Sequence, residues 1–166
     1  MAKSAYLIVS DLHDFYKNLE NRVDYVGEIE FVKEHILEVG LKYRNLGYEV
    51  NHVEPTGIIA ELPGLSDREK MVVLRAEMDA LPIQEQTDMA YTSVNDGCMH
   101  ACGHDFIIAA ALILAKIVTE EQENFPVRIR FLFEPAEEIG EGAKRMLQAG
   151  ALENPKADAF LMFHYA

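Results

Sequence analysis

The chain contains only two cysteines among its 166 residues, too few for the disulfide framework that holds many small secreted domains together. It has no apolar run long enough to cross a bilayer, and its first residues lack the layout of a signal peptide. Basic residues are also scarce, because 15 Lys and Arg stand against 28 Asp and Glu, for a formal net charge of -13. This charge argues against nucleic acid and anionic membranes as partners. Together these absences predict a protein of the reducing cytoplasm.

Apolar residues are plentiful, at 49% of the chain, which is enough to form the core of one domain. Hydrophobic periodicity predicts helices over residues 28–46, 105–119 and 142–149. It predicts strands over residues 48–53, 57–62, 71–76, 127–133 and 159–163, with the strands at 71–76 and 159–163 buried. This order of elements predicts an α/β sandwich with a largely parallel sheet.

Ionisable residues gather where three of the predicted strands end. They are Glu77 and Asp79, Glu137 and Glu138, and His164. A further group, Met99-His100-Ala101-Cys102-Gly103-His104-Asp105, lies between a polar loop and an apolar helix. Because ligands of open α/β sheets bind beyond the carboxyl ends of the strands, we expect these groups to meet at one edge. Thiolate, imidazole and carboxylate together suit zinc, or manganese, cobalt or nickel where oxygen ligands predominate.

The cysteines and the last histidine also have structural interpretations. Cys102 alone fits a small buried hydrophobic residue, and His164 fits a hydrogen-bonded histidine at a strand end. Cys98 with Cys102 resembles half of a zinc knuckle, but the sequence holds no second cysteine pair. The joint placement at strand ends favours a single shared site over these separate interpretations.

The carboxylates have alternatives of the same kind. Glu137 and Glu138 fit the solvated start of a helix, where negative charge interacts favourably with the helix dipole. Glu77 and Asp79 could simply pair with Arg75.

Several segments occur together in an order and spacing that resemble a known family. They are residues 74–82, 99–105 and 133–138, then Gly140, Gly142-Ala143 and the apolar strand that ends at His164. They resemble the metal-dependent amidohydrolases, which include hippurate hydrolase, N-acyl-amino-acid deacylases and indole-acetyl-amino-acid hydrolases. These belong to the wider aminoacylase and carboxypeptidase-like metallopeptidases. The resemblance implies a zinc-exopeptidase-like, three-layer α/β sandwich with a mostly parallel or mixed sheet.

The resemblance also implies a role for each residue of the site. The implied metal ligands are Cys102, His104, Glu138 and His164. Glu137 would be the general base that activates water, with Asp79 beside it in the catalytic machinery. The residues implied to contact the ligands and orient them are Glu77, Asp105 and His100. The complete site would hold two divalent ions of zinc, manganese, cobalt or nickel.

The family reaction is hydrolysis of the amide bond of N-acyl amino acids or related peptides. A metal polarises the carbonyl, the glutamate deprotonates water, and charge stabilises the tetrahedral oxyanion. The resemblance therefore implies a small-molecule N-acyl amino acid or peptide as the substrate. The alternative is an inactive, truncated hydrolase-like domain that binds a metal or a partner without catalysis.

The sequence departs from the family pattern at several positions. Ile107 stands where a histidine is usual, Glu77 where aspartate is commoner, and Glu134 where glutamine is usual. The acidic and histidine-rich signature near the family's N-terminus is poorly matched by residues 11–27. Family members also continue with a lid and dimerisation domain and the rest of the catalytic domain. Residues 1–166 are therefore expected to form a partial catalytic domain without the lid, with an uncovered apolar sheet edge and a tendency to form a homo-oligomer.

Overall fold

The computed structural model describes residues 39–88, 92–93 and 96–163. The strands are β1 (Glu49–Val53), β2 (Gly57–Glu61), β3 (Met71–Glu77), β4 (Arg128–Glu134) and β5 (Ala159–Met162). The helices are α3 (His104–Glu120) and α4 (Gly142–Gln148), with short 3-10 turns at Pro63–Leu65 and Gln122–Asn124. Of the first predicted helix, residues 39–45 are helical in the described part of the chain. The predicted elements that lie in the described part are therefore present, with ends shifted by at most one residue.

The strands form one mixed sheet in the order β1-β2-β4-β3-β5. The hairpin β1–β2 is antiparallel and β2 pairs with β4 antiparallel, whereas β3 pairs in parallel with both β4 and β5. The two long apolar strands β3 and β4 are thus central. Their parallel pairing puts their carboxyl ends at the same edge of the sheet.

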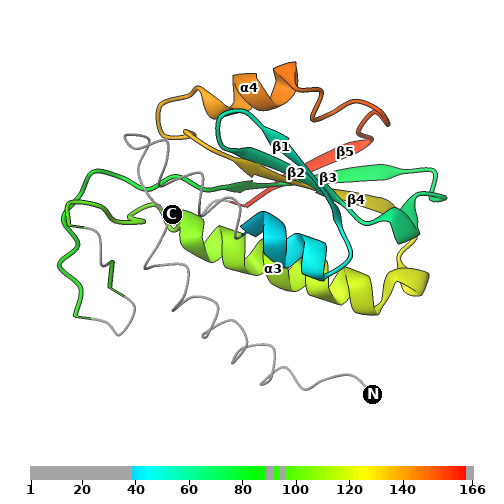
Figure 1. Cartoon of the computed structure of the whole chain (residues 1–166), viewed down its shortest axis with the longest axis horizontal. Coiled ribbons are helices and arrows are strands. Elements are labelled where there is room, and N and C mark those ends of the chain that lie inside the picture. Colours follow the sequence, from blue (N-terminus) through cyan, green and yellow to red (C-terminus); the bar gives the residue numbers. More distant parts are fainter. Residues whose placement is uncertain (1–38, 89–91, 94–95, 164–166) are drawn as a thin grey trace.

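Helices cover both faces of the sheet, which gives three layers (Figure 1). Helix α3 and the helix at residues 39–45 lie on one face, and α4 lies on the other. Alternation along β3 divides its side chains between the two layers. Leu74 and Ala76 belong to the core cluster that includes α3, while Met71 and Val73 pack in a second cluster with Met146 of α4.

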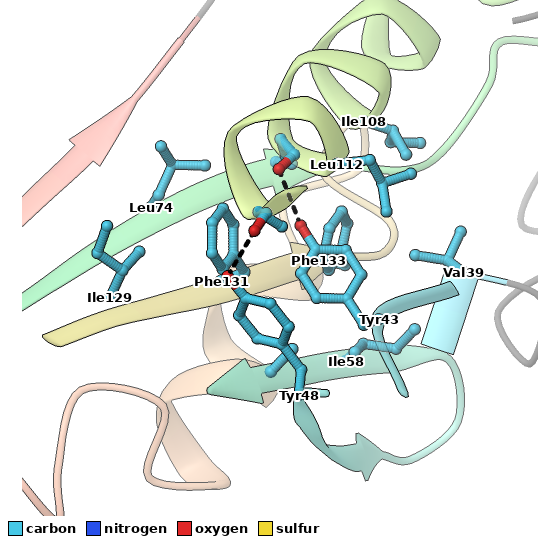
Figure 2. Close-up of a cluster of buried hydrophobic side chains, with 14 of the residues drawn as sticks. Val39, Tyr43, Tyr48, Ile58, Leu74, Ile108, Leu112, Ile129, Phe131 and Phe133 are labelled. Carbon is cyan, nitrogen blue, oxygen red and sulfur yellow. Dashed lines mark hydrogen bonds between the residues drawn. The ribbon is translucent and has the colours of Figure 1, made fainter. Parts of the chain in front are cut away.

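Two tyrosines attach the α3 layer to the sheet. The hydroxyl groups of Tyr43 and Tyr48 each donate a hydrogen bond of 3.1 Å to a backbone carbonyl of α3, at Ala111 and Ala115 (Figure 2). The ring of Tyr43 meets Phe131 of β4 edge to face, with the ring centroids 5.3 Å apart. Such a pair contributes about 0.5–1.5 kcal/mol beyond the area that it buries. These contacts fix α3, whose first residue belongs to the candidate site.

The interpretation of residues 159–163 as a buried strand is wrong. All four residues of β5 are exposed, and Phe160, Leu161, Met162 and Phe163 are 44–55% exposed. The reason is the strand order, because β5 lies at the edge of the sheet beyond β3. The expected uncovered apolar edge is therefore present in the described part of the chain, and self-association through it stays a prediction.

Helix α3 is not equally buried on all sides, although its sequence is apolar nearly all round. Ile107, Ile108 and Leu112 are buried, whereas Phe106 is exposed.

Among the described residues, no helix combines the length and the apolar character needed to span a membrane.

Candidate metal centre

The ionisable residues singled out in the sequence that fall in the described part of the chain lie around the carboxyl ends of β3 and β4 and the start of α3. Glu77 and Glu134 are the last residues of β3 and β4 and pair with each other in the parallel register. Helix α3 starts at His104 because Gly103 before it has a φ of 71°, a left-handed conformation that glycine adopts without steric cost. The expected meeting of these segments at one sheet edge is therefore found for the described residues, and the place of His164 stays a prediction.

Cys102, His104 and Glu138 form a group that could hold a metal ion. One ligand atom from each residue, a sulfur, an imidazole nitrogen and a carboxylate oxygen, lies within 4.8 Å of the others. The His104 Nε2 atom is 3.8 Å from Glu138 Oε1. Tetrahedral ligands about 2.0–2.3 Å from a zinc ion stand about 3.5 Å apart. The distance between His104 and Glu138 is close to this spacing, and Cys102 lies within 4.8 Å of both.

The tautomer of His104 suits metal binding. Its Nδ1 lies 2.9 Å from the backbone carbonyl oxygen of Asp79, and a carbonyl can only accept, so Nδ1 carries the proton. The other ring nitrogen, Nε2, is buried and has no hydrogen-bond partner among the described residues. A buried lone pair without a partner is costly. Such a histidine, held by one nitrogen and bare at the other, has the usual arrangement of a metal ligand.

Asp79 ties the segments of the site together. Its Oδ2 accepts a 3.0 Å hydrogen bond from the backbone N–H of Glu138, and its Oδ1 lies 3.3 Å from His104 Nδ1. Burial acts to raise the pKa of Asp79, but the contacts with His104 and with the Glu138 N–H outweigh it, and the pKa is lowered. Asp79 is therefore a carboxylate that orients two candidate ligands. The alternative that it pairs with Arg75 is wrong.

Acidic surroundings shift the pKa values of two candidate ligands, Cys102 and His104. The hydrogen bond to Glu138, burial and the nearby carboxylates raise the pKa of Cys102 to about 11. Burial acts to lower the pKa of His104, but Asp79 and Glu77 outweigh it and the pKa is raised. Without a cation, the negative charge around Cys102 and His104 therefore favours the protonated form of both side chains. A divalent ion is the kind of charge that would replace those protons.

Glu137 lies beside this group, with its side chain 31% exposed. Its Oε2 is 3.8 Å from His104 Nε2, and its Oε1 is 3.8 Å from Nη2 of Arg75. Burial raises its pKa, with Glu138 and Asp79 acting in the same direction and His104 and Arg75 against it. Glu137 and Glu138 lie in a turn and α4 begins only at Gly142, so the interpretation of the two glutamates as a solvated helix start is wrong.

The turn that carries the two glutamates is tightly folded. Ala136 has a φ of 53°, and its carbonyl accepts hydrogen bonds from the N–H groups of Glu141 and Gly142. Gly142 lies so close to the turn that a Cβ there would be 1.7 Å from the carbonyl oxygen of Pro135. Glycine is therefore required at this position for space.

Arg75 contacts three carboxylates around the site. It donates from Nη1 to Glu77 Oε1 at 2.6 Å and from Nε to Glu134 Oε2. Its third nitrogen, Nη2, faces Glu137. The interpretation that Glu77 pairs with Arg75 is thus confirmed, whereas the contact of Arg75 with the candidate base was missed. The register that brings Glu134 to Arg75 is not readable from the sequence.

The remaining predicted residues have different surroundings. Asp105 lies buried in the first turn of α3, where its Oδ1 accepts from the N–H of Phe106. Both ring nitrogens of His100 are buried without a hydrogen-bond partner among the described residues, and burial followed by the neighbouring His104 lowers its pKa to about 4. His164 lies outside the described residues. Ile107, in place of the usual histidine, is buried in the core cluster.

Cys98 is buried and forms no disulfide bond with Cys102, and the metal-holding group found among the described residues does not include it. The half-knuckle interpretation of Cys98 with Cys102 therefore gains no support.

The mixed five-stranded sheet with donors at its edge has the fold of the zinc-exopeptidase-like class. Residues 73–166, more than half of the chain, match the family described as peptidase family M20/M25/M40. The chain belongs to this family.

Two curated relatives come from Bacillus subtilis (strain 168). The chain is 45% identical to an N-acetylcysteine deacetylase over 102 residues, which are 61% of this chain and 27% of that protein. It is 40% identical to an N-acetyl-L-cysteine deacetylase over 134 residues, which are 81% of this chain and 30% of that protein. The chain thus spans less than a third of the length of these two relatives.

A solved structure shares the fold over nearly the whole chain. It is the Bacillus subtilis YXEP protein, described as a dinuclear metal binding peptidase from the M20 family. The TM-score is 0.86 at 32% identity, and the match covers 98% of this chain and 44% of that one. This similarity confirms the α/β fold. It also confirms that the chain corresponds to only part of such a protein, because the match covers 44% of the YXEP chain.

Proposed function

We propose that this chain is the N-terminal part of the catalytic domain of an amidohydrolase that cleaves the amide bond of N-acyl amino acids or related peptides. The observation that carries the proposal is the convergence of Cys102, His104 and Glu138 within 4.8 Å, with Glu137 beside them. The two deacetylase relatives support an N-acyl amino acid as the class of substrate.

In this proposal Cys102, His104 and Glu138 hold a divalent ion, and His164 completes the ligand set. Zinc, manganese, cobalt and nickel all accept this mixture of sulfur, nitrogen and oxygen donors. The bare, buried Nε2 of His104 supports the fit. The description of the YXEP structure supports two ions in the complete site.

When bound, the ion would supply a Lewis acid that polarises the substrate carbonyl and makes water more acidic. Glu137 would accept the proton of the attacking water and pass it to the leaving nitrogen. Its raised pKa brings this carboxylate closer to the working pH of a general base. Asp79 would keep His104 and Glu138 oriented through the two contacts described above.

Cobalt binding tests the metal site. We expect Co²⁺ to give a thiolate-to-cobalt absorption band in the purified protein, and we expect Cys102→Ser to abolish that band. Cys98→Ser is the matched control, because Cys98 is the other cysteine of the chain and lies outside the group. Loss of the band in Cys98→Ser, with retention in Cys102→Ser, would reject the ligand set.

Hydrolysis is tested separately with a panel of N-acetyl amino acids that includes N-acetylcysteine. We expect Glu137→Gln to keep cobalt and to lose turnover by a factor of about 10² or more. Full turnover in Glu137→Gln would rule out this base. Stoichiometric metal without any hydrolysis by the unaltered protein would favour the metal-binding, non-catalytic alternative, for which Ile107 in the core is the supporting observation.

A further inference from the structure

The carboxyl ends of β3 and β4 hold two buried carboxylates next to each other. Glu77 and Glu134 are partners in the parallel register, and adjacent strands stand about 4.8 Å apart. Glu77 is fully buried and Glu134 is 4% exposed. Two buried like charges at this spacing need a cation between them.

Arg75 supplies that cation. It precedes Glu77 by two residues on β3 and therefore points to the same face of the sheet. Its Nη1 donates to Glu77 at 2.6 Å, and its Nε donates to Glu134. Because a guanidinium is planar and its donors have fixed directions, two such contacts fix its orientation.

The fixed guanidinium presents its third nitrogen to the candidate base. Nη2 lies 3.8 Å from Glu137 Oε1. Among the described residues, the other basic group within that distance is the imidazole of His104, whose Nε2 is 3.8 Å from Oε2. His104 is a proposed metal ligand, so its Nε2 would be engaged once an ion binds. Arg75 would then remain as the anchor of the Glu137 carboxylate.

We propose that Arg75 is a positioning residue, held by Glu77 and Glu134, that orients the carboxylate of Glu137 toward the metal centre. The inference rests on the proposed function for the role of Glu137 as the base, but the position of the Glu137 carboxylate can be measured without any turnover. Arg75 acts through Glu137 and takes no part in holding the metal.

The test uses the complete product of the gene and the variants Arg75→Met, Arg75→Lys and Arg130→Met. Arg130 is the matched control, because it is a buried arginine of the neighbouring strand β4 that pairs with Glu61 at 2.7 Å. It points to the same face of the sheet as Arg75 but contacts neither glutamate of the turn. If Arg75→Met fails to fold, the variant with Glu77→Gln and Glu134→Gln added removes the uncompensated buried charges.

Crystal structures of the metal-free variants give the first readout. In Arg75→Met we expect the Glu137 carboxylate to leave its position by more than about 1 Å, while the donors of Cys102, His104 and Glu138 stay together. Displacement on that scale typically costs about 10²-fold in turnover. Arg130→Met is expected to leave Glu137 in place. An unmoved Glu137 carboxylate in Arg75→Met would overturn the inference, whether or not the protein is active.

Kinetics give the second readout. We expect Arg75→Met to lower kcat by about 10–100-fold at unchanged cobalt content and KM, with partial rescue by Arg75→Lys. In a Glu137→Gln background the same change should have no further effect, because the two residues act as one unit. An equal further loss in that background would show that Arg75 acts independently of Glu137 and would overturn the inference. An unaltered protein without amidase activity would refute the proposed function alone, and the crystal structures would still decide the role of Arg75.

Discussion

Replacing Gly142 by alanine should disrupt the turn that carries Glu137 and Glu138. The added Cβ would lie 1.7 Å from the carbonyl oxygen of Pro135 and 2.7 Å from Cγ of Glu134. Favourable contacts between carbon and other heavy atoms are about 3.5 Å long. The turn and the start of α4 must therefore separate by about 1.5 Å or more, and the backbone of the turn cannot yield as the end of a flexible side chain does.

The displacement has a cost in stability and a cost in metal binding. Overpacking of this kind lowers the free energy of unfolding by about 1–3 kcal/mol, and each kcal/mol lowers the Tm of a chain of this size by about 2–4 °C. Moving the turn also breaks the hydrogen bond from the Glu138 N–H to Asp79, now 3.0 Å long. We expect cobalt affinity to fall by at least about tenfold, since a misplacement of about 1 Å can cost 10²-fold at a catalytic site.

Thermal unfolding and cobalt titration measure the two effects. Gly150→Ala is the control, because Gly150 has a φ of 77° but nothing within 4 Å of a Cβ. Gly150 follows α4 and lies outside the turn. The Gly150→Ala variant should therefore lose about 1 kcal/mol of stability to backbone strain and keep its cobalt affinity. If Gly142→Ala bound cobalt as tightly as the unaltered protein, the close approach at Gly142 would have no bearing on the metal centre.

Three further predictions concern the frame and the metal. Tyr43→Phe removes the buried hydrogen bond to Ala111 and should lower the free energy of unfolding by about 1 kcal/mol, measured by urea denaturation; an unchanged midpoint would contradict it. Asp158→Asn removes a carboxylate whose pKa is lowered by the N–H of Met71 and then by Lys70. The stabilising effect of the Asp158 carboxylate should be present above the unfolded-state pKa and vanish as the pH falls through the folded-state pKa. A difference in stability between the variant and the unaltered protein that grows in acid would refute the reasoning. Cobalt at 100 times its Kd should raise the free energy of unfolding by about 2.7 kcal/mol, and the effect should be absent in Cys102→Ser; equal stabilisation of that variant would contradict the proposed ligand.

The sequence predicted the strands and helices well where apolar patterning is strong. The continuous apolar runs of β3 and β4 and the long apolar run of α3 each correspond to an element. Burial was predicted less well, because it depends on neighbours in the sheet. The apolar residues of β5 look like those of a central strand, but the order of the strands places them at an edge.

The same limit applies to the candidate site. The rule that ligands lie at the carboxyl ends of parallel strands correctly grouped Cys102, His104 and Glu138. It could not reveal that Glu77 and Glu134 share one register position. Only that register explains why Arg75 faces Glu134, and therefore why this acidic residue, unusual for the family, does not leave an uncompensated charge beside the centre.

The charged groups of the described site favour the binding of a divalent cation. Acidic groups raise the pKa values of Cys102 and His104, while Arg75 is already engaged by the buried carboxylates of Glu77 and Glu134. The charge of Arg75 therefore compensates the carboxylates of Glu77, Glu134 and Glu137. It leaves the negative charge around Cys102 and His104 uncompensated. A divalent ion between these ligands would supply the missing positive charge and would satisfy the bare nitrogen of His104 at the same time. In the proposed site, the carboxylates that the sheet register buries would therefore fix Arg75 beside Glu137, and a divalent ion would compensate the acidic groups around Cys102 and His104.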